Sequence, residues 1–180
     1  MKNLVNIPKF EQYKQLVFST SDIVNEIIKN EGPIHHDLLI KRIFEAFYYK
    51  WHYSKKITSR IKKEIEEIFL NNETFINKYM KDGNFYYLQN SNFCRQNDKE
   101  IRKIKYISDI EIKDDIKEII RMCEYVNKDG IFSMLNELLD FSSLTKENRE
   151  RYEKCLKSLL DHNQIIKCNN SEYFRLSKKS

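Results

Sequence analysis

Apolar positions along this chain follow one order of spacings that occurs twice. In each copy, apolar residues recur at helical spacing over a first segment, a shorter second segment and a third segment, and then aromatic and aliphatic runs flank a turn. The first copy extends from about Ser21 to Asn90, and the second from about Ser108 to Ser177. Sequence identity between the copies is low, so the repeat is one of pattern. It predicts two units, each with three helices followed by a β-hairpin.

The predicted helices of the first copy have clear start and stop signals. The run from Ser19 to Asp22 supplies N-cap candidates for the first helix. Gly32-Pro33 ends this helix, because Gly suits the position after a helix and Pro cannot continue one. The second helix is predicted over residues 36–48, and the third over residues 55–71 after an N-cap at Ser54. The buried stripe of the third helix is predicted to contain Ile57, Ile61, Ile65, Ile68 and Phe69.

The helices of the second copy are predicted from similar signals. Ser108 and Glu111 match a capping box at the start of a helix that we expect to stop near Lys128-Asp129-Gly130. A second helix is predicted over residues 131–141, and Thr145 is the predicted N-cap of the third. The polar and basic residues before this copy are expected to connect the two units, partly in extended form over residues 101–107.

Each copy is also predicted to end in a hairpin. In the first, Asp82-Gly83 lies between the strand-like runs 75–80 and 85–88, and an Asp-Gly pair between such runs is a good hairpin signal. In the second, residues 168–171 lie between Ile165-Ile166 and the run 173–176.

An order of three helices and a hairpin is that of the winged helix, a helix-turn-helix with a β-wing, whose third helix usually enters the DNA major groove. The predicted fold is therefore mainly α with small β-hairpins (α+β), in a tandem winged-helix architecture. We expect an N-terminal arm over residues 1–20, winged-helix units over 21–90 and 108–180, and a basic connector over 91–107.

Composition limits the classes of function without selecting one. The chain has 180 residues and a net charge of +5, from 32 basic and 27 acidic side chains, which is too small an excess to demand nucleic acid. No apolar run is long enough to cross a bilayer, and the N-terminus lacks a signal-peptide stretch, so we expect a cytoplasmic protein without membrane contact. The four cysteines show no metal-ligand spacing and are expected to be free thiols, mostly buried.

No grouping of residues predicts catalysis. The chain has only three Gly, so it has no phosphate-cradling glycine loop, and no Ser/His/Asp or Cys/His arrangement stands out. His35 and His36 diverge on a helix, so they are poorly placed to share a metal, and His35 is expected to bond backbone near the helix start. We expect no enzyme activity, no cofactor and no metal site. The abundant acids leave open a small nuclease with an unpatterned carboxylate cluster.

The third helix of the first copy is the predicted DNA-contacting element. Its bases precede its acids, an order that opposes the helix macrodipole and that contact with phosphate would explain. The alternative is an ordinary solvated face. The candidate contacts on this helix are Lys55, Lys56, Thr58, Ser59, Arg60, Lys62 and Lys63.

Other segments offer weaker candidates. Lys78, Lys81 and Asn84 are predicted in the first wing, where they can touch the DNA backbone or the minor groove. Tyr49, Trp51 and Tyr53 lie among bases and can stack on single-stranded bases, although packing between helices is the alternative that we favour for aromatic residues. The third helix of the second copy has the charge pattern of a solvated face, with predicted i,i+4 pairs of Glu150 with Lys154 and of Glu153 with Lys157. This copy is therefore expected to support the first or to bind protein.

Three runs resemble the hallmark of a bacterial domain of unknown function, numbered thirty-three twenty. They are Glu31-Gly32-Pro33-Ile34-His35, the helix segment from Leu38 to Ile43, and Thr58-Ser59-Arg60-Ile61. Thr58 stands where that hallmark has Gly, and the turn before the third helix is longer and aromatic. The resemblance would extend from about Asp22 to Leu176. The family domain sits at the C-termini of proteins with a superfamily-one helicase and a restriction-endonuclease-like module, so the resemblance implies a DNA-processing or defence setting and no catalytic residues.

Two hypotheses follow. The first is a non-enzymatic DNA-binding protein, with double-stranded DNA favoured and a helicase or nuclease as protein partner. The second is a protein-interaction module without DNA binding, which serves for docking or homodimerisation, as tandem winged helices do in some complexes.

Overall fold

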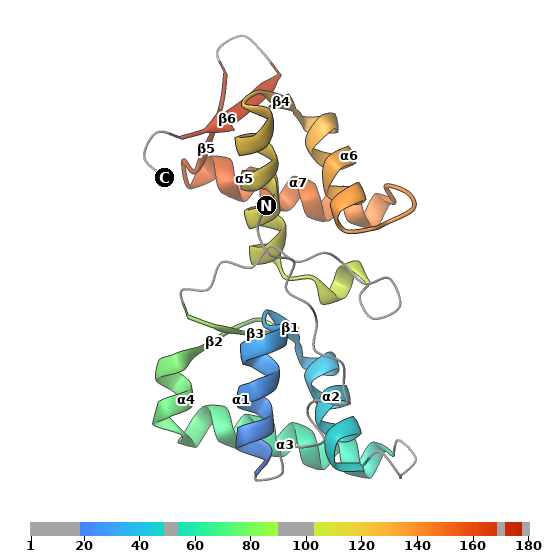
Figure 1. The fold of residues 1–180 in the computed structure, drawn as a ribbon, viewed down its shortest axis with the longest axis vertical. Helices are drawn as coiled ribbons and strands as arrows, with labels where there is room; N and C mark the ends of the chain where they lie inside the picture. The colour runs from blue at the N-terminus through green and yellow to red at the C-terminus, as the bar shows by residue number, and fades with distance from the viewer. Residues whose placement is uncertain (1–18, 49–53, 90–102, 169–171, 178–180) are drawn as a thin grey trace. The chain divides into compact units, whose positions relative to one another are not determined.

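The computed structural model describes residues 19–48, 54–89, 103–168 and 172–177. They form two compact units, unit 1 within residues 19–89 and unit 2 within residues 103–177. Each unit is mainly helical and carries one small antiparallel sheet (Figure 1). The predicted α+β class is therefore confirmed at this level.

Unit 1 places its three strands near the carboxyl end of α1, while α3 passes close to the amino end (Figure 1). The strand order is β1-β3-β2, with Ile34 opposite Tyr86 and Tyr79 opposite Leu88. Its elements are α1 (Thr20–Glu31), β1 (Ile34–His35), α2 (His36–Tyr48), α3 (Lys55–Asn71), α4 (Glu73–Lys78), β2 (Tyr79–Asp82) and β3 (Phe85–Leu88).

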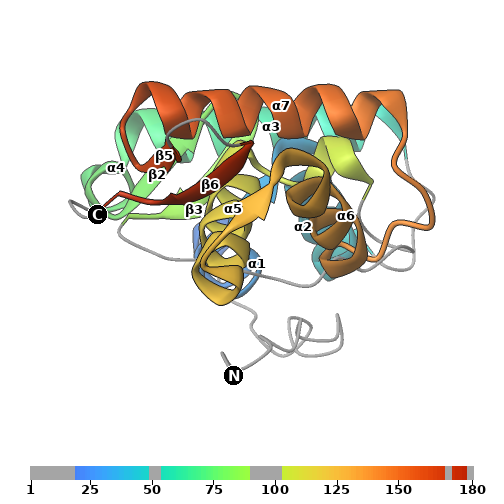
Figure 2. The same cartoon turned by 90° about the horizontal axis from the view of Figure 1, so that it is seen from above.

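Unit 2 repeats this arrangement with one helix fewer between its long third helix and its hairpin. Its strand order is β4-β6-β5, and Ile165 lies opposite Leu176 as Tyr79 lies opposite Leu88 in unit 1. The hairpin lies beside the carboxyl end of α7 (Figure 2). After a short 3-10 helix (Ile104–Tyr106), the elements are α5 (Asp109–Cys123), β4 (Val126–Asn127), α6 (Lys128–Leu138), α7 (Lys146–Asp161), β5 (Ile165–Lys167) and β6 (Tyr173–Leu176).

The predicted helix starts are confirmed by their caps. Ser19 accepts from the backbone N–H of Asp22, and Ser54 accepts from that of Ile57. Thr145 caps α7 in the same way, and Ser108 and Glu111 form the predicted capping box. Side-chain acceptors satisfy N–H groups that have no partner inside the helix, so these positions fix where each helix begins.

Gly32 ends α1 for a different reason from the one expected. Its φ of −69° is not left-handed, so no special backbone conformation requires glycine here. A Cβ at this position would instead clash with the carbonyl oxygen of Ile28, to which the Gly32 N–H donates at 2.9 Å. Close approach of the two backbones therefore selects glycine.

The segment expected to be the first strand of the unit 1 hairpin is partly helical. Residues 73–78 form α4, capped by Asn72, whose side chain accepts from the Phe75 N–H. The strand β2 begins only at Tyr79 and pairs with β3 around the predicted turn, where Gly83 has a φ of +56°. The hairpin is thus confirmed, whereas the strand expected over residues 75–78 is wrong, because a cap and core packing of Phe75 favour one helical turn.

The first helix of unit 2 also ends earlier than expected. The helix α5 stops at Cys123, and Glu124 takes φ 57° and ψ −47° while the Tyr125 N–H donates to the Cys123 carbonyl at 2.6 Å. This is a γ-turn, a rare and strained backbone shape. Gly130 does not end the helix but lies in the first turn of α6, where Asn127 caps its N–H and leaves little room for a Cβ.

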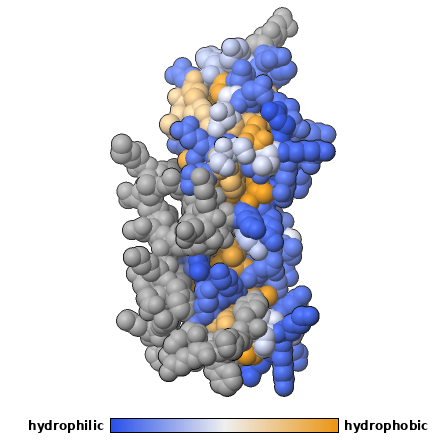
Figure 3. All heavy atoms as spheres, turned by 90° about the vertical axis from the view of Figure 1, so that its right-hand side faces the viewer, coloured by the Kyte–Doolittle hydropathy of each residue, from blue (hydrophilic) through white to orange (hydrophobic). Residues whose placement is uncertain are grey.

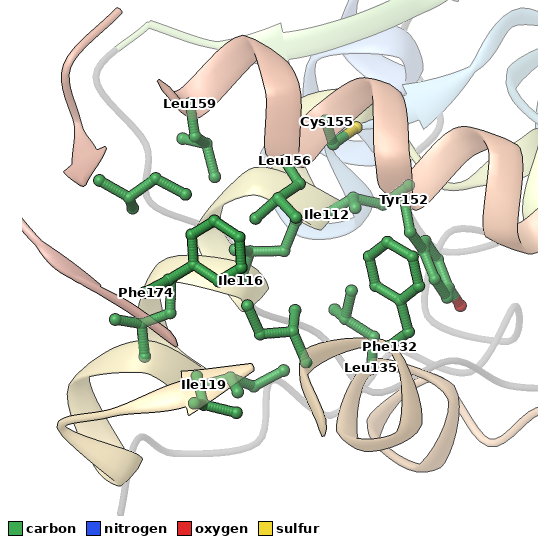
Figure 4. Close-up of a cluster of buried hydrophobic side chains, with 14 of the residues drawn as sticks. Ile112, Ile116, Ile119, Phe132, Leu135, Tyr152, Cys155, Leu156, Leu159 and Phe174 are labelled. Carbon is green, nitrogen blue, oxygen red and sulfur yellow. The ribbon is translucent and has the colours of Figure 1, made fainter. Parts of the chain in front are cut away.

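Each unit has its own apolar core. In unit 2, residues from α5, α6, α7 and β6 converge, with Ile116, Phe132, Leu156 and Phe174 among those that Figure 4 labels. Ile104 and Ile107 belong to this core, so the part of the expected extended connector that the structure describes is a 3-10 turn packed on unit 2. In unit 1 the core includes Ile27, Ile43, Ile61, Ile65 and Tyr86.

Among the residues that Figure 3 colours by hydropathy, hydrophilic ones predominate, with apolar side chains between them. Within the described ranges, no helix is both long and apolar enough to span a bilayer. Of the cysteines that the structure describes, only Cys155 is buried, while Cys123 and Cys168 are half-buried, so the expectation of mostly buried thiols is wrong for these residues.

Candidate nucleic-acid interface

The helix α3 is attached to the unit 1 core by one face. Ile61 and Ile65 are buried and Ile57 is half-buried against the core. The 3.6-residue period then turns the polar residues between them away from the core. Among the predicted contacts on α3, the exposed ones are Lys55, Lys56, Ser59, Arg60, Lys62 and Lys63.

Charge is distributed unevenly along this exposed face. The first turn of α3 contains no acid, and its acids, Glu64, Glu66 and Glu67, all lie in the second half. Arg60 donates to Glu64 at 2.8 Å, and Lys63 lies 3.6 Å from Glu67. Within the described part of the chain, Lys55, Lys56 and Lys62 have no ion-pair partner. The first half of the helix therefore presents positive charge that acids of the described residues do not neutralise locally.

Thr58 differs from the other predicted contacts on α3. It is half-buried, and its hydroxyl lies within donating distance of the carbonyl oxygens of Ser54 at 3.2 Å and Lys55 at 3.0 Å. Such bonds back to the preceding turn are common for threonine in helices. Ser59, in contrast, is exposed on the outer face.

The residues expected in the first wing separate into two places. Lys78 is not in the hairpin but ends α4, where its Nζ donates to the Asn25 side chain of α1 at 2.8 Å. Lys81 lies on β2 with its Nζ 5.5 Å from the centre of the Tyr86 ring, and Asn84 is in the turn. Only the latter two positions therefore belong to the hairpin. The predicted stacking residues Tyr49, Trp51 and Tyr53 lie outside the described residues.

The two adjacent histidines point to different partners. His35 Nδ1 accepts from the Asp37 backbone N–H at 3.1 Å, which confirms the expected bond to backbone near the helix start. His36 Nδ1 lies 3.1 Å from the Tyr86 hydroxyl, and its Nε2 is buried without a hydrogen-bond partner among the described residues. Burial, and then the charge of Lys62, lower the pKa of His36. Sequence reasoning missed the His36–Tyr86 pair, because β1 brings together residues that are far apart in the chain.

The third helix of unit 2 carries as many bases, and three of them, Arg149, Arg151 and Lys154, bond other elements of the fold. Arg151 donates to the carbonyl oxygens of Ile104 and Ile107 and, at 3.0 Å, to Asp109. Lys154 also pairs with Asp109, at 3.0 Å, so the predicted pair with Glu150 is wrong. Burial alone would raise the pKa of Asp109, but hydrogen bonds from Lys154 and Arg151 lower it below its ordinary value.

The other expected pair of α7 is also replaced by a tertiary one. Glu153 bonds Lys128 of α6 rather than Lys157, and Arg149 lies 3.5 Å from Asp129. These bases hold α7 to α5, α6 and the 3-10 turn. Lys146 and Lys157 stay exposed on α7, and Lys146 lies 3.8 Å from Glu150 of the same helix. The two helices therefore differ in how many of their bases bond other elements.

The described residues contain no group of three His, Cys, Asp or Glu side chains that could hold a metal ion. The family model described as "Protein of unknown function (DUF3320)" matches residues 21–50, which cover nearly all of α1, then β1 and α2. The resemblance predicted from the Glu31–His35 and Leu38–Ile43 runs is confirmed over this range, and its extension to Leu176 stays a prediction. No curated protein and no solved structure matches the chain.

Proposed function

We propose that this protein is a non-enzymatic, cytoplasmic DNA-binding protein built from two winged-helix units, with α3 of unit 1 as its main contact. The element order supports the architecture. In unit 1, a short strand separates the first two helices and pairs with the second strand of the hairpin, as in winged helices, and unit 2 has the same order. The match to a family of unknown function is compatible with, and does not specify, an accessory role beside a helicase or nuclease.

The observation that carries the proposal is the first half of α3. Lys55, Lys56 and Lys62 are exposed and have no ion-pair partner within the described residues, and no acid lies in the first turn. Such an arrangement destabilises the helix slightly, because the macrodipole favours acids at the amino end. Phosphate groups would reverse that effect, since they supply negative charge where the helix end is positive.

Double-stranded DNA fits this surface better than single strands. A single α-helix fills the major groove of B-DNA, which is about 12 Å wide. Lys81 and Asn84 lie on the hairpin, which packs against the second half of α3, and they then take the place of wing contacts to the backbone. Binding through lysine and arginine releases counterions, so the affinity is expected to fall steeply as salt rises.

Fluorescence anisotropy with labelled duplex and single-stranded DNA across a salt series tests this proposal. The full chain is compared with the variant Lys55→Glu, Lys56→Glu, Lys62→Glu, which should lose about tenfold or more in duplex affinity and about one unit of salt slope per lost contact. The matched control is Lys146→Glu, Lys157→Glu, Lys167→Glu, which changes the net charge equally on exposed positions of unit 2. Equal losses of duplex affinity in both variants, or no loss in either, would contradict the assignment of DNA binding to α3.

A protein-docking function is the second candidate, and exposed apolar residues of unit 2 favour it. Met122 and Tyr125 are 71% and 60% exposed on either side of the γ-turn at Glu124. Strained turns and exposed aromatic side chains are both found where proteins bind partners. Absence of DNA binding even at low salt, together with a stable dimer in sedimentation, would favour this candidate.

A further inference from the structure

Unit 1 has a surface pocket beside the second half of α3, the half that follows its basic residues. It has a volume of about 390 Å³ and lies between the end of α3, α4 and the hairpin. Its lining residues include Phe69 and Leu70 of α3, Ile76 of α4, and Tyr79, Lys81 and Tyr86 of the hairpin. The volume is in the range that accommodates one or two large side chains.

The wall of this pocket is aromatic and firmly held. The Phe69 ring centre lies 4.6 Å from that of Tyr86, and the Phe75 ring behind it lies 5.0 Å from that of Tyr79. The Tyr79 hydroxyl donates to the Asn25 side chain of α1, and the Tyr86 hydroxyl bonds His36. Both rings therefore keep their places when the pocket is empty, so binding would need little ordering of the wall.

The rim of the pocket exposes apolar surface that the fold itself does not use. Leu70 is 74% exposed and Ile76 is 46% exposed, and they come from two different helices that meet at Asn72. Single exposed apolar residues are common, but two that line one pocket beside an aromatic wall are typical of a binding site.

One acid, Glu66, and one base, Lys81, line the pocket beside this apolar rim. Glu66 lines the pocket, and Glu73 begins α4 three residues before Ile76. Neither carboxylate has an ion-pair partner among the described residues, whereas Lys81 is held over the Tyr86 ring. Glu66 lies close enough to the Tyr86 hydroxyl to contribute, after burial, to raising its pKa to about 12. These carboxylates would repel DNA phosphates and attract a cation.

Comparison with unit 2 singles out the element that forms this pocket. In unit 2, residues 162–164 alone join α7 to β5, whereas in unit 1 the helix α4 lies between α3 and β2. The pocket therefore depends on an element that the shared arrangement of the two units does not require.

We propose that this pocket binds a segment of a partner protein that inserts a large apolar side chain against Phe69, Tyr79 and Tyr86 and places a lysine or arginine beside Glu66. The proposal does not rest on the basic first half of α3, because the pocket is formed by the second half of α3, α4 and the hairpin; of the proposed DNA contacts, Lys81 also lines it. Contact through apolar anchors at helical spacing is a common mode of segment recognition.

The test uses the full chain and a defined probe, a short amphipathic helical peptide of leucine and lysine. Its counterpart has every lysine replaced by glutamate. Titration of the isotope-labelled protein, followed by backbone amide NMR, should show saturable binding of the lysine peptide with shifts at Leu70, Ile76 and Lys81. The glutamate peptide should bind about two- to fivefold more weakly, because it loses the attraction to Glu66.

Variants locate the binding. Glu66→Lys should weaken the lysine peptide about fivefold, while Glu147→Lys, an equal charge change in the first turn of α7, should leave its affinity unchanged. Ile76→Asp should weaken it about tenfold through lost apolar contact. Failure to bind at millimolar concentration, equal binding of both peptides, or shifts confined to other surfaces would overturn the proposal. So would self-association that Ile76→Asp abolishes, since the occupant would then be a second copy.

Discussion

The Arg60 guanidinium donates to the Glu64 carboxylate at 2.8 Å, one turn further along α3. The other oxygen of the same carboxylate accepts from the Thr20 hydroxyl at 2.8 Å, at the start of α1. One acid thus links a predicted DNA contact to the first helix of the core. On this exposed face, a phosphate competes with the Glu64 carboxylate for the N–H groups of Arg60.

This relationship predicts that Glu64→Gln strengthens DNA binding. The neutral amide still accepts from Thr20, but it no longer competes with phosphate for Arg60. An exposed pair of this kind contributes about 0.2–1 kcal/mol, so duplex affinity is expected to rise by a factor of about 1.4 to 5 at low salt. Anisotropy titrations of Glu64→Gln against Glu147→Gln measure the effect, and an unchanged or weaker affinity would separate Arg60 from the interface.

A second prediction concerns two buried tyrosines with opposite hydrogen-bond status. The Tyr152 ring lies beside Phe132 (Figure 4), and its buried hydroxyl has no hydrogen-bond partner among the described residues, whereas the Tyr86 hydroxyl bonds His36. Tyr152→Phe is expected to leave the stability of unit 2 unchanged or raise it by up to about 1 kcal/mol. Tyr86→Phe should instead destabilise unit 1 by about 1–2 kcal/mol, since it leaves His36 Nδ1 unpaired.

Hydrogen exchange of core amides in each unit gives the two free energies of opening separately. A loss of more than 1 kcal/mol in Tyr152→Phe would mean that its hydroxyl bonds a group that is not among the described residues.

A third prediction separates a structural base from a surface base on α7. Arg151 donates hydrogen bonds to the carbonyl oxygens of Ile104 and Ile107 and to the Asp109 carboxylate, and its side chain is 19% exposed. Arg151→Ala is expected to destabilise unit 2 by about 2–4 kcal/mol, because it leaves these acceptors unsatisfied. Lys154→Ala, which removes an exposed partner of the same Asp109, should cost about 1 kcal/mol or less. Similar losses in both variants would contradict the role of Arg151 in holding the 3-10 turn.

A fourth prediction is a pH dependence of unit 1. The folded state lowers the pKa of His36 below 6.5, mainly by burial and then through Lys62 and Lys81, while Asp37 and Glu66 oppose the shift. The unfolded chain therefore binds a proton first as pH falls. Stability is fully present above pH 6.5 and declines as pH falls from there toward the folded pKa.

The variant His36→Gln should remove this decline while keeping an acceptor for Tyr86. The measurement is the free energy of opening of α1 and α2 amides by hydrogen exchange between about pH 7 and pH 5. The acid Asp109 does not interfere, because its lowered pKa makes its contribution disappear only below about pH 3.8. A flat profile in the wild-type chain would contradict the assignment.

Sequence patterns predicted the elements that short-range chemistry determines. Ser54 and the apolar period fixed α3 to the residue, and Asp82-Gly83 located the unit 1 hairpin. The two-residue strands β1 and β4 escaped notice, because each is defined only by pairing with a strand more than forty residues away. The helix α4 was also missed, because aromatic and β-branched residues conceal a cap at Asn72.

The candidate site shows the same division. The exposure of Lys56 and Lys63 follows from the helical period and was predictable. The ion-pair partners of charged residues were not predictable from the sequence. Lys154 pairs with an acid of α5 and Glu153 with a base of α6, rather than with their i,i+4 neighbours on α7. Tertiary contacts of this kind hold α7 in place, and the local spacing of charged residues in the sequence does not predict them.

The helix α4 makes unit 1 separable into a scaffold and an accessory. Unit 2 spans the same connection in a few residues, so a chain in which residues 72–78 are shortened to a turn like 162–164 would keep the backbone path of both helix and hairpin. Such a deletion also removes Phe75 from the core, and the vacated volume would need a large aliphatic replacement nearby. The reciprocal chimaera inserts α4 after Asp161 of unit 2. Together, the two chimaeras would show whether binding of the proposed partner segment can be moved from unit 1 to unit 2 as a module.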